Sequence, residues 1–443
     1  MSENPPETVV SSNTSFATES GSETQEITTK SNLDLLEPQI KKVNVPRNNE
    51  ISFELEEGGS FYISVVRGTG EIFGSVLVKH QKYYYEGSKY FSIYTQRGCL
   101  VEMKGNSYKY EVRENTYMKS YIQLNNQLNL FSHQAKEGDI PGPKVLIVGP
   151  TDSGKTSLCK VLLNYAFRFG KTPSFIDLDV GQNAISIPGT MSMVHVDKML
   201  DPVADFNFCS STYSLHYGLN SPQRKALYLR NINQLAKVFE SACQREQCIK
   251  YSGCFINTCG WVKDFGFDAI KNVAIAFEVQ HVIVVGCEET KNKLKEILPS
   301  SSCEVILIPK STGAVQRSTQ FRRCSRDQKV TQYFKGAYGV KKSYDKTYTF
   351  DSIKFLQYGK SSGNETTESL QPVQIGEYLK DKLVSALGDD YSTDVLNENI
   401  RAYATVKCVD LENKKVILSS PYFNLADYNS FILMEYDLEN SNY

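Results

Sequence analysis

Residues 149–156 of the chain read Gly149-Pro150-Thr151-Asp152-Ser153-Gly154-Lys155-Thr156, and this motif is the strongest indication of its fold. Two glycines lie five positions apart, and Lys and Thr follow the second one directly, which is the pattern of a phosphate-binding loop. Residues 144–148 form a short apolar, β-branched run that predicts a buried strand before the loop. Apolar residues recur at helical spacing over 158–169, and Gly170 ends that pattern. A glycine turn that matches by chance would lack these flanks, so we predict a strand, a phosphate loop and a helix.

This arrangement suits the binding of a triphosphate. The N–H groups of such a loop and the N-terminus of its helix present positive potential to phosphate oxygens. Lys155 would reach the β- and γ-phosphates, and the Thr156 hydroxyl would bind Mg²⁺. The predicted nucleotide contacts are Gly149, Pro150, Thr151, Asp152, Ser153, Gly154, Lys155, Thr156 and Ser157.

The residues around the loop alternate between strand and helix patterns. Further buried strands are predicted at 174–178, 253–257, 281–285 and 304–308, and helices at 224–243, 265–277 and 290–298. This order is typical of an α/β fold with a mostly parallel sheet, in which ligands bind beyond the carboxyl ends of the strands. We therefore predict a central P-loop domain over residues 135–340.

β-strand patterns also occur before and after the central domain. Runs at 52–55, 61–66, 83–85, 91–94 and 109–112, with a glycine turn at 57–59, predict a small antiparallel domain over 40–134. Its last part, 121–134, predicts a connecting helix. Runs at 347–350, 402–406 and 415–418 predict a second small β-rich domain over 341–443, with a polar loop at 360–367. Residues 1–39 are rich in Ser, Thr and Glu and predict a disordered tail.

Composition narrows the class of protein. With 40% hydrophobic and 22% charged residues the chain is typical of a globular protein, and its net charge of −1 means that any nucleic-acid site must be a local patch. The apolar runs are too short to span a bilayer and the N-terminus lacks the pattern of a signal peptide, so we expect no membrane partner and a cytosolic or nuclear location. The 11 cysteines include no C-x-x-C pair, which favours reduced structural thiols over a zinc site.

Two carboxylates follow the strand predicted at 174–178. Alternation places Asp177 and Asp179 on one face, at the strand end where ligands bind. One would hold a water on Mg²⁺ and the other would orient an attacking hydroxyl. The alternative is an acidic, solvated turn; their position in the strand after the phosphate loop favours function.

Trp261 and a group of arginines remain open to two interpretations each. Trp261, the single tryptophan, follows the strand at 253–257 and would either stack on a nucleobase or lie in the core. Arg317, Arg322, Arg323 and Arg326 would either close over a transferring phosphoryl group or an RNA backbone, or form a solvated helix face.

The chain resembles the animal-type polyribonucleotide 5′-hydroxyl kinases of the pre-mRNA cleavage and tRNA-splicing machinery. The matching stretches are the phosphate loop, Leu162-Leu163-Asn164-Tyr165-Ala166, Leu178-Asp179-Val180-Gly181-Gln182, Ser186-Ile187-Pro188-Gly189-Thr190-Met191, Ile256-Asn257-Thr258-Cys259-Gly260-Trp261-Val262 and Phe321-Arg322-Arg323. The likeness extends over about 44–438.

This resemblance implies a role for each matched position. Lys155 and Thr156 match the phosphate-loop Lys and the Mg²⁺ ligand, Asp179 the carboxylate that activates the RNA 5′-hydroxyl, and Asp177 a contact to metal-bound water. The remaining implied roles are phosphate clasp for Thr258 and Gly260, RNA binding for Trp261 and Gln182, lid arginines for Arg317, Arg322 and Arg326, and adenine contact for Glu50 and Lys89. The implied cofactors are ATP and Mg²⁺. The implied partners are RNA with a 5′-hydroxyl end, a cleavage-factor scaffold and the tRNA splicing endonuclease, in the nucleus.

Two rival functions stay under consideration. Some fungal relatives bind ATP without transferring phosphate, so an ATP-bound scaffold subunit is the main alternative to an active kinase. A GTPase is a weaker one, because the chain contains no Asn-Lys-x-Asp motif for reading guanine.

Overall fold

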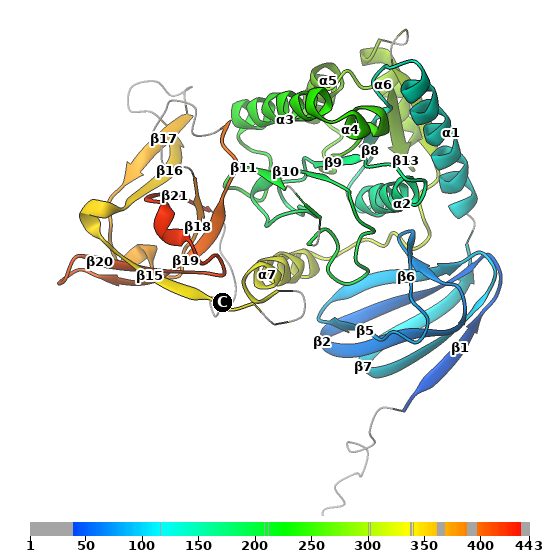
Figure 1. Ribbon diagram of the computed structural model, residues 1–443, viewed down its shortest axis with the longest axis horizontal. Coiled ribbons are helices and arrows are strands. Elements are labelled where there is room, and N and C mark those ends of the chain that lie inside the picture. The colour runs from blue at the N-terminus through cyan, green and yellow to red at the C-terminus, as the bar shows by residue number, and fades with distance from the viewer. Residues whose placement is uncertain are drawn as a thin grey trace, which may run out of the picture. The chain divides into compact units, whose positions relative to one another are not determined.

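A computed structural model of the protein contains three large β-sheets among its described residues, and each sheet is formed by a separate part of the chain (Figure 1). The structure describes residues 39–435 except 116, 208, 211, 300, 302, 337–338, 340, 361–367 and 388–396. The predicted tail, apart from its last residue, and nearly all of the predicted polar loop lie outside the described residues. Residues 40–443 group into one unit by their contacts.

The central sheet carries the phosphate loop. Its strands lie in the order β11 (Tyr213–His216), β10 (Thr190–His195), β9 (Ser174–Asp177), β12 (Cys254–Asn257), β8 (Lys144–Val148), β13 (His281–Val285) and β14 (Glu304–Ile308). The last five are parallel to one another, whereas β10 and β11 add antiparallel pairs at one edge. The prediction of an α/β fold with a mostly parallel sheet is confirmed. The two antiparallel strands were not predicted.

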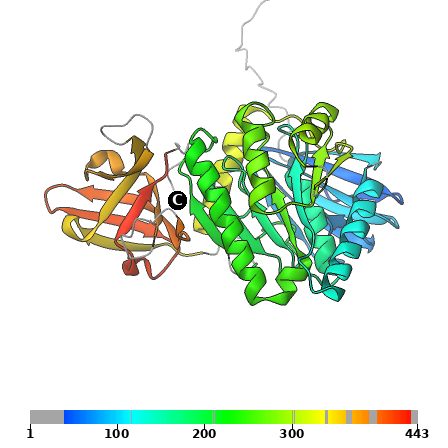
Figure 2. The same cartoon turned by 90° about the horizontal axis from the view of Figure 1, so that it is seen from above.

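Helices cover both faces of this sheet (Figures 1 and 2). They are α1 (Met118–Glu137), α2 (Lys155–Arg168), α3 (Lys225–Arg245), α4 (Gln247–Ser252), α5 (Phe265–Ala276), α6 (Glu288–Ile297) and α7 (Thr319–Lys335). Alternation along β8 explains the layers: Val145 and Ile147 pack against α1 and α2, whereas Leu146 and Val148 pack in the cluster that includes α3 and α5. The sheet is buried on both faces, as its continuous apolar strands require.

The N-terminal sheet is antiparallel. It contains β1 (Lys41–Val45), β2 (Asn49–Gly68), β3 (Glu71–Ile72), β4 (Ser75–Val76), β5 (Tyr83–Glu86), β6 (Lys89–Thr95) and β7 (Cys99–Glu114). The turn predicted at 57–59 was wrong, because β2 continues through it. The pairing of β2 with β7 shifts register between Leu55 and Ser60, so an irregularity in the ladder absorbs the glycines that would otherwise end the strand.

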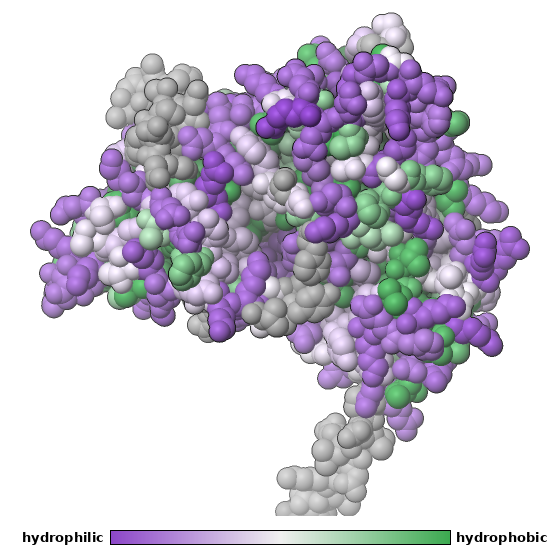
Figure 3. Space-filling view, viewed as in Figure 1, coloured by the Kyte–Doolittle hydropathy of each residue, from purple (hydrophilic) through white to green (hydrophobic). Residues whose placement is uncertain are grey.

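The C-terminal sheet follows α7. Its strands lie in the order β15 (Tyr344–Thr349), β20 (Lys415–Ser420), β19 (Ala402–Asp410), β18 (Leu383–Ala386), β21 (Ser430–Leu433), β16 (Lys354–Lys360) and β17 (Glu368–Val373). All three sheets lie where the sequence predicts them; the exact boundaries between domains remain a prediction. The face drawn in Figure 3 is largely hydrophilic, with scattered hydrophobic residues. No helix among the described residues is long and apolar enough to cross a membrane.

Candidate functional site: a nucleotide cavity and its lid

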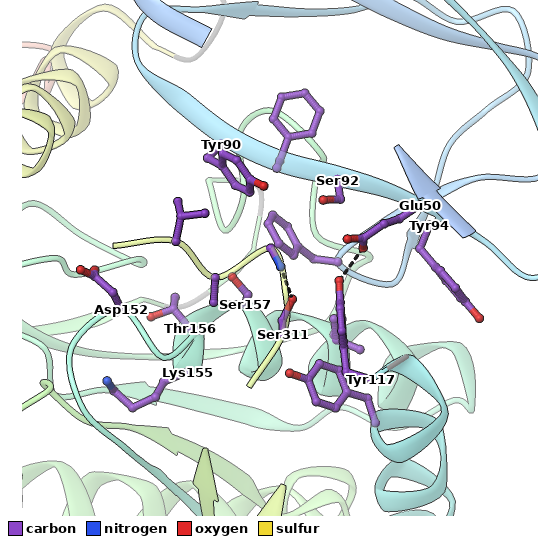
Figure 4. A pocket seen from close by; sticks show the side chains of 18 of the residues that line it. Glu50, Tyr90, Ser92, Tyr94, Tyr117, Asp152, Lys155, Thr156, Ser157 and Ser311 are labelled. Atoms are coloured by element: carbon purple, nitrogen blue, oxygen red, sulfur yellow. Dashed lines mark hydrogen bonds between the residues drawn. The ribbon is translucent and has the colours of Figure 1, made fainter. Parts of the chain in front are cut away.

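A cavity of about 190 Å³ lies against the phosphate loop. We call it the nucleotide cavity. One side is the N-terminal sheet, and the other is formed by the loop and the start of α2, with the segment that carries Ser311 between them (Figure 4). Its lining brings together many of the predicted residues: Glu50, Thr151, Asp152, Gly154, Lys155, Thr156, Ser157, Asp179, Gln182, Gly260, Arg317 and Arg322.

The phosphate loop has the backbone conformation that its glycines permit. Gly154 has φ 91° and directly precedes α2, a conformation that side chains disfavour. The Lys155 ammonium donates to the carbonyls of Gly149 at 3.0 Å and Pro150 at 2.9 Å, so it lies across the loop. Burial lowers the pKa of Lys155, and the Asp179 carboxylate opposes that shift. The first N–H groups of α2 therefore face a site with a fixed cation beside them, which fits a polyphosphate.

The Asp177 carboxylate is fully buried at the end of β9. It accepts hydrogen bonds from Asn257 Nδ2 at 2.9 Å and from the backbone N–H groups of Asp179 at 3.1 Å and Ala184 at 2.7 Å. Burial and the neighbouring Asp179 raise its pKa to about 7. Asn257 Nδ2 also lies 3.2 Å from Thr156 Oγ1, so one amide connects the buried carboxylate to the predicted metal ligand. A hydroxyl and a carboxylate that share one amide donor are oxygen groups of the kind that Mg²⁺ prefers as ligands.

Asp179 lies in the nucleotide cavity with Lys155. Its Oδ1 accepts from the backbone N–H groups of Gly181 and Gln182, both at 3.0 Å, which fixes the carboxylate in place. Burial raises the pKa of Asp179, and Lys155 and Arg322 partly offset that rise. A carboxylate with a raised pKa is a better proton acceptor than an exposed one, and here it is held beside the predicted phosphate site.

The arginine segment is connected to the phosphate loop through Asp152. The Asp152 carboxylate accepts from Arg322 Nη2 at 2.6 Å and from the backbone N–H of Arg317 at 3.0 Å. Both arginines line the nucleotide cavity, and burial lowers the pKa of Arg317. Arg326 lies instead in an adjacent cavity. The arginines are thus on the same side of the molecule as Lys155, which the prediction of a lid requires.

The N-terminal sheet contributes a buried carboxylate. Glu50 is 1% exposed, and its Oε2 accepts from Asn115 Nδ2 at 2.9 Å and from the Tyr117 hydroxyl (Figure 4). Its Oε1 lies 3.2 Å from Arg113 Nε but makes no hydrogen bond of good geometry with the described residues. An acceptor of this kind fits the exocyclic amine of adenine, which is a donor. Glu50 therefore lines the nucleotide cavity, and its contact with adenine stays a prediction.

Lys89 does not line the nucleotide cavity but an adjacent one, and its contact with adenine stays a prediction. Glu50 pairs with Tyr94 and Leu55 pairs with Lys89, so the alternation of side chains puts Lys89 on the opposite face from Glu50. Tyr90, Ser92 and Tyr94 line the nucleotide cavity in its place (Figure 4).

The predicted clasp is divided between two places. Gly260 lines the nucleotide cavity and lies against Thr151, whereas the Thr258 hydroxyl is buried and donates to the Ile147 carbonyl at 2.9 Å. Trp261 is half-buried, packs against Phe265 with 5.4 Å between ring centroids, and lines a different small cavity. The roles of Thr258 and Trp261 in binding phosphate and RNA therefore stay predictions. Gln182 does reach the cavity, and its Nε2 lies 3.4 Å from the Arg322 carbonyl.

Sequence reasoning missed two connecting residues. Asn257 belongs to a matched stretch but was given no role, and Asp152 was predicted to contact nucleotide rather than the lid. A polar residue at the end of a buried strand was the available signal for Asn257. No local pattern predicts the Asp152–Arg322 pair, because its members are 170 positions apart.

Family models match two parts of the chain. Residues 44–135 match the N-terminal beta-sandwich domain of polyadenylation factor, and residues 149–336 match the P-loop of the mRNA cleavage and polyadenylation factor CLP1. The two models meet at the nucleotide cavity, because Glu50 lies in the first and Lys155 in the second.

Known proteins match nearly the whole chain. The chicken (Gallus gallus) protein named polyribonucleotide 5′-hydroxyl-kinase Clp1 is 33% identical over 410 residues, covering 90% of this chain and 96% of its own. The human (Homo sapiens) protein of that name is 32% identical over 407 residues, covering 89% and 95%. A solved Clp1p–Pcf11p complex aligns with a TM-score of 0.82 at 21% identity, covering 90% of this chain and 99% of the other. A second, described as showing an extended Pcf11p–Clp1p interface and the basis of ATP loss in a point mutant, has a TM-score of 0.80. From these matches, the chain belongs to the Clp1 family of polyribonucleotide 5′-hydroxyl kinases and polyadenylation factors.

Proposed function

We propose that this protein is an ATP-dependent polynucleotide kinase that phosphorylates the 5′-hydroxyl end of RNA. The observation that carries the proposal is the presence of Asp179 and Lys155 in one cavity, closed on one side by Arg317 and Arg322. A phosphate site alone would fit many nucleotide-binding proteins. A fixed carboxylate beside it adds the group that a hydroxyl acceptor needs.

Each residue of the site has one role in the proposed phosphoryl transfer. Glu50 binds the adenine amine, and the phosphate loop with Lys155 holds the phosphates. Thr156, and Asp177 through a water, would hold Mg²⁺, which would supply positive charge to the phosphate oxygens. Asp179 orients the ribose 5′-hydroxyl for in-line attack and accepts its proton late, because a carboxylate is a weak base for an alcohol. Arg317 and Arg322 stabilise the charge that develops on the transferred group.

Transfer of label from ATP to a 5′-hydroxyl RNA tests the proposal. We expect label on the oligonucleotide with the wild-type protein and none with Lys155→Ala, while Lys346→Ala, an exposed change on β15 in the C-terminal sheet, transfers normally. Bound ATP that persists without turnover would instead support the rival function, a scaffold subunit whose nucleotide is structural.

We also propose that the protein works in the nucleus as a subunit of the mRNA 3′-end cleavage machinery and of tRNA splicing. The solved relative bound to Pcf11p supports a scaffold partner of that kind. Co-purification with a Pcf11-type protein and with tRNA splicing endonuclease subunits, together with imaging of the tagged protein, tests the two assemblies and the location separately.

A further inference from the structure

A second cavity, of about 270 Å³, lies beside the nucleotide cavity. We call it the lysine cavity, after Lys89 at the start of β6, Lys160 on α2 and Lys329 on α7. The lining residues that the two cavities share are Phe73, Tyr90, Phe91, Thr156, Ser157, Gln182 and Arg317. The lysine cavity therefore opens next to the place where the acceptor hydroxyl must lie.

The lining of the lysine cavity is strongly cationic. Besides the three lysines it includes Arg317 and Arg326, whereas Asp205 is the one carboxylate among its described lining residues. Five cations against one anion leave a formal excess of four positive charges, in a chain whose net charge is −1. Such a concentration of one sign in a recess attracts an anion.

The lysines are poorly neutralised within the protein. Lys160 pairs with Asp205 at 2.7 Å, and the Lys329 ammonium donates to the Ala184 carbonyl at 2.7 Å, which occupies one of its three N–H donors. Burial lowers the pKa of Lys89, and it lowers that of Lys329 to about 8; Lys160 adds to both shifts and Asp205 opposes them. A bound oxyanion would offset the free-energy cost of keeping these buried lysines charged.

The position of the lysine cavity favours a phosphate of the RNA over a phosphate of ATP as the anion that binds there. Lys160 is five residues beyond Lys155 on α2, which is about 7 Å further along the helix from the end that faces the triphosphate. Gln182, next to the loop that holds Asp179, lies on the boundary between the cavities. An acceptor strand whose 5′-hydroxyl lies at Asp179 can continue into the lysine cavity.

We propose that the lysine cavity binds the first backbone phosphodiester of the acceptor RNA, so that the protein selects an oligonucleotide end over a nucleoside. This inference rests on the proposed kinase function. Lysine ammonium groups suit this task because they bind phosphate oxygens as compact charges without demanding one fixed geometry.

The test compares two 5′-hydroxyl dinucleotides that differ only in charge, one with a natural phosphodiester and one with a neutral methylphosphonate linkage. We expect kcat/KM of the wild-type protein to favour the charged acceptor by about tenfold or more, as for a charge-assisted contact. Lys329→Gln should reduce that preference without changing KM for ATP. Lys329→Arg should largely keep it, and Lys346→Gln, in β15, should leave it unchanged.

Equal use of the two acceptors by the wild type, or an unchanged preference in Lys329→Gln, would overturn the inference. If the wild type phosphorylates neither acceptor, the kinase proposal fails and binding decides the inference alone. The salt dependence of binding to a 5′-hydroxyl oligoribonucleotide should then fall by about 0.7 in log–log slope for each lost phosphate contact. The same slope in wild type and Lys329→Gln would overturn it, and thermal melting of each variant checks that the fold is intact.

Discussion

Replacement of Gly260 by alanine tests whether the segment after β12 holds the phosphate loop in place. A Cβ built on Gly260 would lie 2.3 Å from Thr151 Oγ1, 2.4 Å from Thr151 N and 2.5 Å from Thr151 Cα. The hydroxyl can rotate away, but the backbone atoms cannot. Gly260→Ala therefore has to push the segment and the loop apart.

The size of the effect follows from these distances. Ordinary contacts of a Cβ atom begin at 3.4 Å, so the loop must retreat by about 1 Å. Overpacking of this kind costs about 1–3 kcal/mol of stability. A displacement of about 1 Å in a group that positions a reacting phosphate costs on the order of 10²-fold in rate, which corresponds to about 2.7 kcal/mol.

Steady-state kinetics with ATP and a 5′-hydroxyl RNA, together with ATP titration, measure the effect. We expect kcat/KM to fall by about 10²-fold and the affinity for ATP to weaken. The matched control is Gly359→Ala in β16, whose Cβ would meet only Gln371 Cγ, at 3.7 Å. Normal ATP affinity and turnover in Gly260→Ala would refute the claim that this close approach sets the position of the loop.

Three further changes test other parts of the structure. Asp179→Asn keeps the shape but removes the proton acceptor, so the single-turnover transfer rate should fall by about 10²–10⁴-fold with little change in ATP affinity; an equal loss of both would contradict the assigned role. Asn257→Ala removes the donor shared by Asp177 and Thr156. We expect kinase activity to fall by about 10–100-fold, and by more as the Mg²⁺ concentration is lowered. An unaltered Mg²⁺ titration would argue against this bridge. Burial lowers the pKa of His216 from its ordinary 6.5 to about 3. The neutral imidazole therefore contributes fully to the free energy of unfolding above pH 6.5, and this contribution falls by about 1.4 kcal/mol per pH unit as the pH drops from 6.5 toward 3. Between pH 6.5 and 5, the free energy of unfolding measured in urea should fall by about 1.6 kcal/mol less in His216→Gln than in wild type, and parallel losses would disprove this.

The local patterns of the chain predict the architecture well. The run at 144–148, the phosphate loop and the helix after it all obey rules that involve neighbouring residues, and β8 and α2 appear where those rules place them. The carboxyl edge of the sheet then follows, because parallel strands end together there. Glu50, Lys155 and Asp179 were named from motif and resemblance, and the fold brings these three to one cavity.

Other features depend on contacts that no local pattern encodes. The continuation of β2 through two glycines depends on its long partner β7, and the face that Lys89 occupies depends on strand register. Periodicity shows that successive side chains of a strand alternate between two faces. Which residues lie on which face of the sheet depends on the register with the partner strand.

A P-loop α/β core between two β-rich regions, and the chemical groups that a phosphoryl-transfer site needs, can be predicted from the sequence because short runs of neighbouring residues encode them. Which of these groups meet depends on the packed fold, which brings together Asp152 with Arg322, Asn257 with Asp177, and Lys329 with Lys160 in the lysine cavity. The physical reason is that hydrogen bonds and charge interactions act over a few ångströms in space. Residues far apart along the chain come within that range only after the core has packed.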